Sequence, residues 1–246
     1  MKLTGKTAVV TGGTKGIGRA TALALAEQGA NVIATYAHDT KAAAALEQAA
    51  AKYPVTTTVI RADITDVAAV AALFEQIASR YDSIDILVNN AGIFDEADSP
   101  GNLAAMQRVY EADLFAQVRM TDAASKVMRR GKIIFISSIH GKLGHGRPSA
   151  IGYASSKAAL ESYMKNLAKA LAPDILVNAI APGRTLTPMW GDMTAEYKAE
   201  KAAGHLIGRW IEPEEIADGV LFLLKNDAVC GEVLIIDGGM SLVTLG

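Results

Sequence analysis

The sequence has 246 residues, of which 50% are hydrophobic and 20% charged, enough to bury the core of one domain spanning residues 1–246. The formal net charge of −2 argues against nucleic acid or an anionic membrane as partner, because both attract basic surfaces, so we expect a small-molecule partner.

The single cysteine, Cys230, excludes an internal disulfide and fits a reducing, cytoplasmic compartment. Because Cys230 lies in a strand-like run, we expect it in the core. No apolar run has the length of a membrane span or a signal-peptide core.

Short β-branched runs alternate with longer stretches rich in alanine and leucine, which are typical of helices. The runs are Thr7–Val10, Val32–Thr35, Thr56–Ile60, Ile84–Val88, Ile133–Ile136, Ile175–Ile180 and Val233–Ile236. They show little polar alternation, which indicates strands that are buried on both faces of a parallel sheet. We therefore predict a single-domain α/β Rossmann fold, a doubly wound parallel sheet of about seven strands with helices on both faces. Ligands of such sheets bind beyond the carboxyl ends of the strands.

The first strand leads directly into TGGTKGIG, residues 11–18, which a helical run follows. Gly12, Gly16 and Gly18 permit a tight turn and a close approach of the backbone to a ligand. The next helix then offers its N-terminal amides to a phosphate group. The spacing G-x-x-x-G-x-G differs from the G-x-G-x-x-G fingerprint, and a glycine cluster by itself is equally consistent with an ordinary turn. Its position after the first strand favours a pyrophosphate site.

A second motif, YASSK at residues 153–157, places a tyrosine and a lysine four positions apart. In a helix, Tyr153 and Lys157 lie on the same face and are neighbours. Taken alone, such a pair is more often a tyrosine at a helix start and a solvated lysine. The surrounding motifs must therefore decide its meaning.

Six motifs occur in one order along the chain: TGGTKGIG (11–18), NNAG (89–92), ISS (136–138), YASSK (153–157), PGRTLT (182–187) and IDGG (236–239). Over essentially the whole chain, this order and spacing resembles the short-chain dehydrogenase/reductase family, most of all its 3-oxoacyl-[acyl-carrier-protein] reductases and related ketoreductases. The resemblance implies hydride transfer between a nicotinamide cofactor and a carbonyl or secondary alcohol. It also implies a homotetramer formed through paired long helices and the C-terminal segment 236–246.

The resemblance assigns catalytic roles to Ser138, Tyr153 and Lys157. Reduction of a carbonyl builds an alkoxide that needs a proton donor, but a free tyrosine has a pKa near 10. The Lys157 cation should lower the pKa of Tyr153 toward neutrality and also bind the nicotinamide ribose. Ser138 should hold the substrate oxygen, whereas Ser137 is expected only to end the strand.

The resemblance also implies a set of cofactor contacts. Asn89, Ala91 and Gly92 should pack against the adenosine ribose, and Asp63 should accept from the adenine amine, although each is also consistent with an ordinary loop. Thr187, with Thr185 as the competing candidate, should bind the nicotinamide carboxamide. The expected contacts are Gly12, Thr14, Lys15, Gly16, Ile17, Gly18, Tyr36, Asp63, Ile64, Asn89, Ala91, Gly92, Tyr153, Lys157, Pro182, Gly183, Thr185 and Thr187.

Three residues bear on the choice between NADP(H) and NAD(H). Tyr36 stands at the end of the second strand, where an acidic residue would grip the 2′-hydroxyl of NAD. Asp39 lies about 20 residues after the glycines, but its place before TKAAAALEQ is more typical of a helix N-cap. Lys15 resembles the basic residue that meets the 2′-phosphate of NADP, although an exposed loop lysine is the alternative. We predict NADP(H), and NAD(H) stays open.

Asp113 departs from the family pattern, because the family usually carries at this point an asparagine that anchors a proton-relay water. An ionised Asp113 near Lys157 would partly cancel the field of the lysine and shift the working pH upward. The alternatives are a carboxylate satisfied by the local backbone without a kinetic role, or a shifted alignment.

The remaining segments give weaker signals. The loop 139–152 is slightly longer than in the family and carries His140 and His145, which we expect to line or rim the pocket without binding metal. Residues 188–210 resemble a substrate lid whose apolar side chains favour an apolar substrate or core packing. Arg129 and Arg130 are consistent with docking of an acyl-carrier protein, but complementing a helix dipole is the preferred interpretation. We expect the segment 94–99 to be a solvated loop.

Two classes of function remain. The first is an NADP(H)-dependent ketoreductase that acts on a 3-oxoacyl thioester-like carbonyl, or in reverse an alcohol or sugar dehydrogenase. The second is a dinucleotide-binding sensor or scaffold without turnover. Intact Ser138, Tyr153 and Lys157 favour the enzyme, and Asp113 is the feature that leans toward the sensor.

Overall fold

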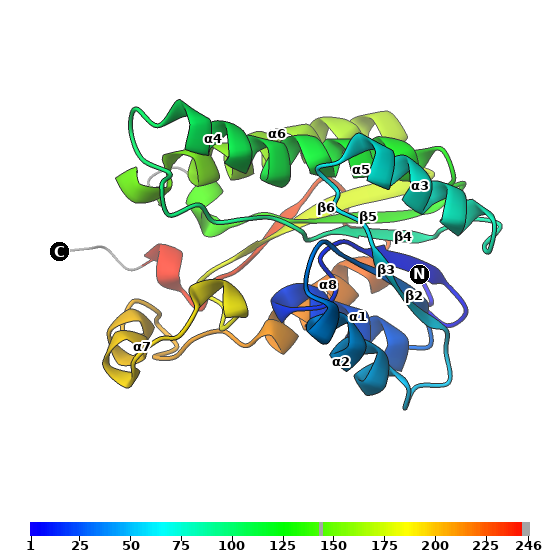
Figure 1. Ribbon diagram of the computed structural model, residues 1–246, viewed down its shortest axis with the longest axis horizontal. Coiled ribbons are helices and arrows are strands. Elements are labelled where there is room, and N and C mark those ends of the chain that lie inside the picture. Colours follow the sequence, from blue (N-terminus) through cyan, green and yellow to red (C-terminus); the bar gives the residue numbers. More distant parts are fainter. Residues whose placement is uncertain (143–144, 243–246) are drawn as a thin grey trace.

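Seven parallel strands form the central sheet of the computed structural model, which describes residues 1–142 and 145–242 (Figure 1). The strands are β1 Thr7–Val10, β2 Asn31–Tyr36, β3 Thr57–Arg61, β4 Ile86–Asn89, β5 Gly131–Ile136, β6 Ile175–Pro182 and β7 Val233–Ile236. Their order is β3-β2-β1-β4-β5-β6-β7, so the chain reverses its direction of sheet growth between β1 and β4. The predicted fold class is confirmed, and each predicted strand overlaps one of these seven.

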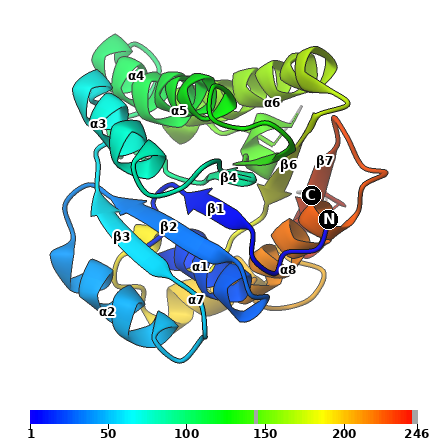
Figure 2. The same cartoon turned by 90° about the vertical axis from the view of Figure 1, so that its right-hand side faces the viewer.

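The helices cover both faces of the sheet in two layers (Figure 2). They are α1 Gly16–Glu27, α2 Thr40–Ala50, α3 Val67–Ala78, α4 Leu103–Tyr110, α5 Ala116–Ser125, α6 Ile151–Leu171, α7 Ala195–Ala202 and α8 Pro213–Lys225. One core contains residues of α1, α2 and α8, and the other contains residues of α3, α5 and α6. Successive strand residues point to opposite faces, so Val9 enters one core while Val10 enters the other.

Side-chain caps set where several of these helices begin. The Asp39 carboxylate accepts from the backbone N–H of Ala42, so the prediction that Asp39 caps α2 is confirmed. Glu212 and Glu215 form a capping box at the start of α8, where Pro213 takes the first helical position. These caps fix where the helices begin, at the ends of loops that lead from the carboxyl ends of the strands.

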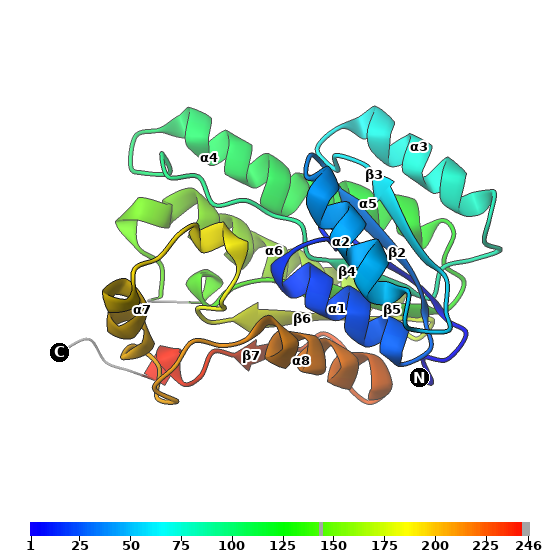
Figure 3. The same cartoon turned by 60° about the horizontal axis from the view of Figure 1, so that its bottom comes forward.

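The lid segment stands apart from the two helical layers. Residues 188–210 leave the carboxyl end of β6, form a 3-10 turn Pro188–Trp190 and then α7 (Figure 3). The rings of Trp190 and Trp210 meet edge to face at 5.1 Å, which ties the two ends of the segment together. Between α4 and α5, residues Glu111–Phe115 form a π-helical turn, a feature often found at functional sites.

Several expectations about individual residues are wrong. Cys230 is exposed, because it lies in the loop before β7 and not in the strand itself. The segment 94–99 is not wholly solvated, since Asp98 is 1% exposed. Arg129 and Arg130 do not complement a helix dipole, because α5 ends at Ser125 and both lie in a bend before β5.

The predicted interface segment 236–246 is described only as far as residue 242, so its last four residues lie outside the described chain. In the described part, no helix combines the length and the apolar character needed to cross a membrane.

Candidate active site

A cavity of about 900 Å³ runs along the carboxyl ends of the central strands. It extends from the glycine loop after β1 to the start of α6 and the lid segment. Its lining includes most of the residues singled out in the sequence: Gly12, Thr14, Lys15, Gly16, Ile17, Tyr36, Asp63, Ile64, Ala91, Gly92, Asp113, Ser138, Tyr153, Lys157, Pro182, Gly183, Thr185 and Thr187. The fold thus collects side chains from distant motifs into one cavity.

Two predicted cofactor contacts lie outside this cavity. Asn89 is fully buried, and its side-chain amide donates to the hydroxyl of Thr121, so Asn89 joins β4 to α5. Gly18 packs against the first turn, since a Cβ there would lie 2.3 Å from the carbonyl oxygen of Gly12. The neighbour Asn90, the second residue of the NNAG motif, lines the cavity and donates to the carbonyls of Thr11 and Gly12.

The glycine loop leaves room for a phosphate group at the start of α1. Gly12 and Gly16 have φ values of +60° and +49°, in the left-handed region that side chains disfavour. A Cβ on Gly16 would lie 3.0 Å from the side chain of Thr187, so only glycine allows the loop this close to the segment after β6. No side chain caps α1, so its first amides are available to a ligand. These features fit the pyrophosphate of a dinucleotide.

The opposite end of the cavity contains Tyr153 and Lys157 on one face of α6. The Lys157 ammonium lies 5.5 Å from the centre of the Tyr153 ring, as the four-residue spacing requires. Lys157 also donates to the carbonyl of Ile136 at the end of β5. Ser138 follows the same strand, and its hydroxyl accepts from the backbone N–H of His140. The last residue of β5 thus binds the lysine ammonium, and Ser138 lies two residues further along the chain.

Asp113 lies in the π-helical turn and contacts Lys157 directly. The carboxylate oxygen Oδ2 is 3.0 Å from the lysine nitrogen, and both side chains are almost completely buried. The contact is an ion pair without good hydrogen-bond alignment, because Oδ2 has no partner in hydrogen-bond geometry. Oδ1 accepts from the backbone N–H of Ile93 at 2.7 Å. The structure thus places one carboxylate oxygen of Asp113 against Lys157 and the other on a backbone N–H group, and a kinetic role of Asp113 stays a prediction.

The ionisable groups of this cluster shift one another's pKa values. Burial opposes the lysine charge, but the Asp113 carboxylate and the Tyr153 phenol outweigh it and raise the pKa of Lys157. Burial raises the pKa of Asp113, although Lys157 opposes this shift. Burial also raises the pKa of Tyr153; Lys157 lowers it, and Asp113 raises it further. Lys157 therefore lowers the pKa of Tyr153 as expected, but burial and Asp113 outweigh the lysine, so the net shift in the protein alone is upward.

The end of the cavity where adenosine is expected is less buried and more polar. Lys15 forms an ion pair with Asp39, and both side chains are partly exposed. Asp63 accepts from the backbone and the hydroxyl of Thr65. Tyr36 lines the cavity at the end of β2. The described part of the chain contains no cluster of three or more potential metal ligands.

The comparisons with known proteins agree with this geometry. A family model described as "Enoyl-(Acyl carrier protein) reductase" matches residues 12–241. The chain is 38% identical to the 3-oxoacyl-[acyl-carrier-protein] reductase FabG of Aquifex aeolicus (strain VF5), over 98% of this chain and 99% of that protein. It is also 38% identical to the cis-4-hydroxycyclohexanecarboxylate dehydrogenase of Sinomonas cyclohexanicum, over 97% of both chains. A short-chain dehydrogenase from Burkholderia cenocepacia J2315, solved in complex with NADP, superposes with a TM-score of 0.90 at 31% identity, covering 98% of this chain and all of that one.

The chain belongs to the short-chain dehydrogenase/reductase family. The resemblance predicted from the six motifs is thereby confirmed, and the protein is an oxidoreductase.

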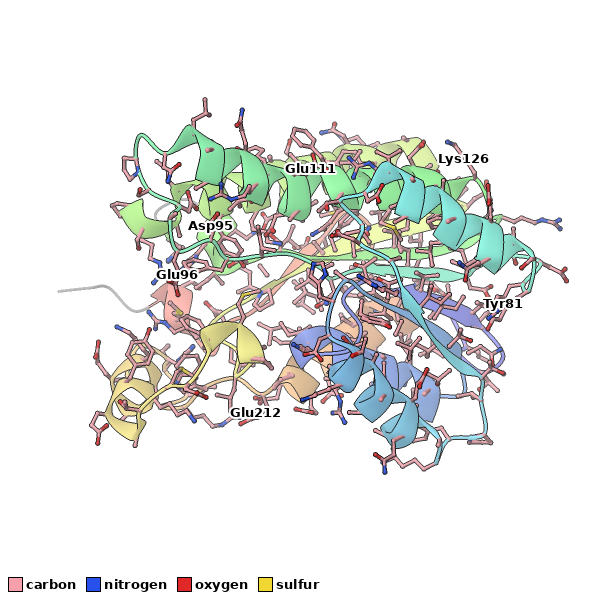
Figure 4. The ribbon with its side chains drawn as sticks, viewed as in Figure 1. Tyr81, Asp95, Glu96, Glu111, Lys126 and Glu212 are labelled. Atoms are coloured by element: carbon pink, nitrogen blue, oxygen red, sulfur yellow. The ribbon has the colours of Figure 1, made fainter. Side chains whose placement is uncertain are left out.

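Asp98 is a residue of this short-chain dehydrogenase/reductase site that sequence reasoning missed. It lies in the loop after β4, on which Figure 4 labels its neighbours Asp95 and Glu96. Its two carboxylate oxygens accept from the backbone N–H groups of Gly152 and Tyr153, each at 2.8 Å. Asp98 therefore caps the start of α6 at the residue that carries the phenol. No local signal reveals this contact, because the two segments are more than 50 residues apart.

His140 closes the substrate end beside Tyr153. Its ring stands perpendicular to the Tyr153 ring with centroids 5.9 Å apart. Burial, together with the nearby Arg147 and Arg184, lowers the pKa of His140 to about 4, so the imidazole is neutral near pH 7. His145, the other histidine of this loop, does not line the cavity.

Proposed function

We propose that this short-chain dehydrogenase/reductase is an NADP(H)-dependent ketoreductase with Ser138, Tyr153 and Lys157 as its catalytic residues. The observation that carries the proposal is the single cavity, with a phosphate-sized glycine turn at one end and a phenol and an ammonium at the other. A sensor needs only the first of these ends. A buried ammonium held beside a phenol is costly to maintain, and proton transfer to a reacting oxygen gives it a use.

The cofactor would lie along this cavity, where its nicotinamide supplies or accepts the hydride. The turn at Gly12 and Gly16 and the free amides of α1 would hold the pyrophosphate. Asp63 would face the adenine, and Ala91 and Gly92 the ribose beside it. Thr185 and Thr187 would orient the carboxamide, and Thr185 is the more buried of the two.

At the reacting carbonyl, Ser138 would donate a hydrogen bond to the substrate oxygen and stabilise the negative charge that develops on it. Tyr153 would then give its proton to this oxygen, and the phenolate left behind would be stabilised by the Lys157 cation. Asp113 would hold Lys157 in its charged form, because the carboxylate raises the pKa of the ammonium. The same carboxylate opposes formation of the phenolate, so Asp113 acts on the two groups in opposite senses.

Preference for NADP(H) would rest on Lys15. The side chain at the end of β2 is Tyr36, so no carboxylate there repels a 2′-phosphate. Lys15 pairs with Asp39, and both line this end of the cavity. A 2′-phosphate would have to share Lys15 with Asp39, which limits the preference and keeps NAD(H) as the alternative cofactor. Support comes from the NADP-bound Burkholderia relative.

The substrate we favour first is a 3-oxoacyl thioester, as in the name of the Aquifex relative, and an alcohol or sugar oxidised in reverse is the second candidate. Docking of an acyl-carrier protein stays a weak prediction. Arg129 and Arg130 precede β5, whereas Tyr153 lies beyond the carboxyl end of that strand, so a carrier bound there would be far from the reaction in the same chain.

A homotetramer also stays a prediction. Exposed apolar side chains support it, since Leu103 and Phe115 are 65% and 51% exposed beside α4 and α5. Phe222 on α8 and Ile235 on the edge strand β7 are exposed as well. Faces of this kind are typical of subunit contacts. The cytoplasmic location rests on the single cysteine alone.

The test is the oxidation of NADPH and of NADH with a panel led by an acetoacetyl thioester, with Tyr153→Phe as the matched variant. We expect turnover with NADPH and a loss of about 10³-fold or more in Tyr153→Phe at unchanged NADPH affinity. A crotonyl thioester tests reduction of a carbon–carbon double bond, which the name of the matching family model suggests. Tight NADPH binding without turnover on any carbonyl, alcohol or sugar would instead identify the sensor.

A further inference from the structure

Two arginines from different segments line the cavity at its substrate end. Arg147 lies in the loop that precedes α6, and Arg184 follows β6 directly after Gly183. Both side chains are partly buried. The charge of Arg147 reaches both Tyr153 and His140, and the charge of Arg184 also reaches His140, which places both guanidinium groups near the reacting end of the cavity.

Neither arginine has an acidic partner within ion-pair distance in the described ranges 1–142 and 145–242. The Arg147 guanidinium lies over the Phe94 ring, 5.2 Å from its centre, and its buried Nε has no hydrogen-bond partner. Arg184 donates to the carbonyl of Lys201 at the end of α7. Glu200 favours the charge of Arg184 but forms its ion pair with Lys201, and Glu96 is exposed on the cavity wall.

This arrangement is electrostatically unfavourable in the protein alone. Burial lowers the pKa of Arg184, and the neighbouring Arg147 lowers it further. The same two guanidinium groups and burial keep His140 neutral, and its buried Nδ1 has no hydrogen-bond partner. Partly buried like charges become favourable when an anion binds between them, and guanidinium groups match the two oxygens of a carboxylate.

We propose that the substrate carries a carboxylate, held by Arg147 and Arg184, with its carbonyl or hydroxyl carbon placed at Tyr153. The substrate class is then an oxo-carboxylate in the reducing direction and a hydroxy-carboxylate in the oxidising direction. This inference rests on the proposed function and refines it. It changes the expectation of an apolar substrate, because the apolar Met189 and Trp190 would contact only the spacer between carbonyl and carboxylate.

The experiment compares matched acids and esters: 4-oxopentanoate and 5-oxohexanoate against their methyl esters. Turnover is measured with NADPH, and binding is measured by calorimetry with saturating NADP⁺. We expect at least one acid to exceed its ester about tenfold or more in kcat/KM and in affinity, the effect of a charge-assisted hydrogen-bond pair. Arg147→Gln and Arg184→Gln should each reduce this acid-to-ester ratio, because each should lower the constants of the acid more than those of the ester.

Two variants and one measurement on the wild-type protein make the result specific. Arg147→Lys keeps the charge and should restore part of the acid preference, which a purely structural role against Phe94 would not do. Arg80→Gln removes an exposed arginine after α3, outside the cavity, and should leave the ratio unchanged. In the wild-type protein, binding of the acid should raise the pKa of His140, followed by NMR, and the ester should not.

Equal constants for acids and esters in the wild-type protein, or an acid preference that persists in both glutamine variants, would refute the carboxylate site. An arginine-dependent preference for acetoacetyl coenzyme A over acetoacetyl N-acetylcysteamine would refute it as well, because the recognised anion would then be a phosphate. If the acids bind through the arginines and nothing oxidises NADPH, the proposed redox function fails while the anion site stands.

Discussion

The two ends of the cavity are built in different ways. At the end proposed for the pyrophosphate, one continuous stretch runs from β1 through the glycine turn to the start of α1, and it offers backbone groups to a ligand. The substrate end combines the loop after β4, the π-helical turn, the segment after β5, α6 and the segment after β6. Its geometry depends on buried charged side chains. The first end therefore requires that no side chain fills the turn. The second end requires charged residues that are far apart in the sequence to come together in the fold.

The largest effect on NADPH binding is expected from Gly18→Ala, at the end of the cavity proposed for the dinucleotide. The new Cβ would lie 2.3 Å from the carbonyl oxygen of Gly12, so the turn must move. Overpacking of this kind costs about 1–3 kcal/mol or more, so we expect a melting temperature lower by roughly 5–10 °C and weakened NADPH binding. Calorimetry and a thermal melt measure both. In the matched variant Gly146→Ala, the new Cβ would lie 3.2 Å from the methyl group of Ala154 and 3.8 Å from the carbonyl oxygen of His140, and both properties should change little.

The next prediction concerns Asp98→Ala, which should disturb the substrate end of the cavity and leave the dinucleotide end intact. Its loss leaves the N–H groups of Gly152 and Tyr153 without their acceptor at the start of α6. Two such bonds to a charged group suggest a loss of about 2–4 kcal/mol in unfolding free energy. We expect kcat to fall about tenfold because Tyr153 is less well positioned, with an unchanged Kd for NADPH.

Asp95→Ala is the control on the same loop. It removes an ion pair with the exposed Arg108 and a hydrogen bond from the backbone N–H of Ala97, and it should leave kcat near the wild-type value. Asp98→Asn keeps one acceptor oxygen and should recover part of kcat. If both Asp98 variants leave kcat unchanged, the cap does not position the phenol.

The pH dependence of the rate in wild type and in Asp113→Asn tests the electrostatics of the substrate end. Burial raises the pKa of Tyr153, and the Asp113 carboxylate raises it further. In alcohol oxidation the phenolate accepts the proton, so the rate rises as the pH passes the pKa of Tyr153. Removing the Asp113 charge lowers this pKa, and the rising limb should move to lower pH.

His140 should not contribute to that limb, because its pKa is about 4. The control is Asp122→Asn, which removes an exposed carboxylate of α5 that pairs with Lys126. Identical profiles for wild type and Asp113→Asn would contradict an electrostatic role of Asp113 at Tyr153.

The smallest effect is expected at the partly exposed adenosine end, from Lys15→Ala. Exposed ion pairs contribute about 0–1 kcal/mol, so the ratio of NADPH to NADH affinity should fall only several-fold. Asp39→Asn should raise the same ratio by freeing Lys15, and it keeps a side-chain oxygen for the N-cap of α2. The two changes are measured as dissociation constants at low and at physiological salt. Equal ratios in all three proteins would remove Lys15 from cofactor selection.

The sequence predicted the parts of the site that depend on local spacing. Tyr153 and Lys157 share a helix face because four residues make about one turn, and the glycine turn follows directly from its strand. It misplaced Asn89, because alternation along β4 turns that side chain into the core toward Thr121. It also missed Asp98, whose partners lie 54 and 55 residues away.

The sequence by itself determined the fold class, the family and the pair at Tyr153 and Lys157, because these depend on periodicity, motif order and helix geometry. Only the tertiary structure decided the electrostatics of the site. It placed Asp113 against Lys157 inside the protein, and it brought Arg147 and Arg184 to the same cavity. Burial removes the water that would screen these charges, so their effect depends on separations in space that spacing along the chain does not reveal.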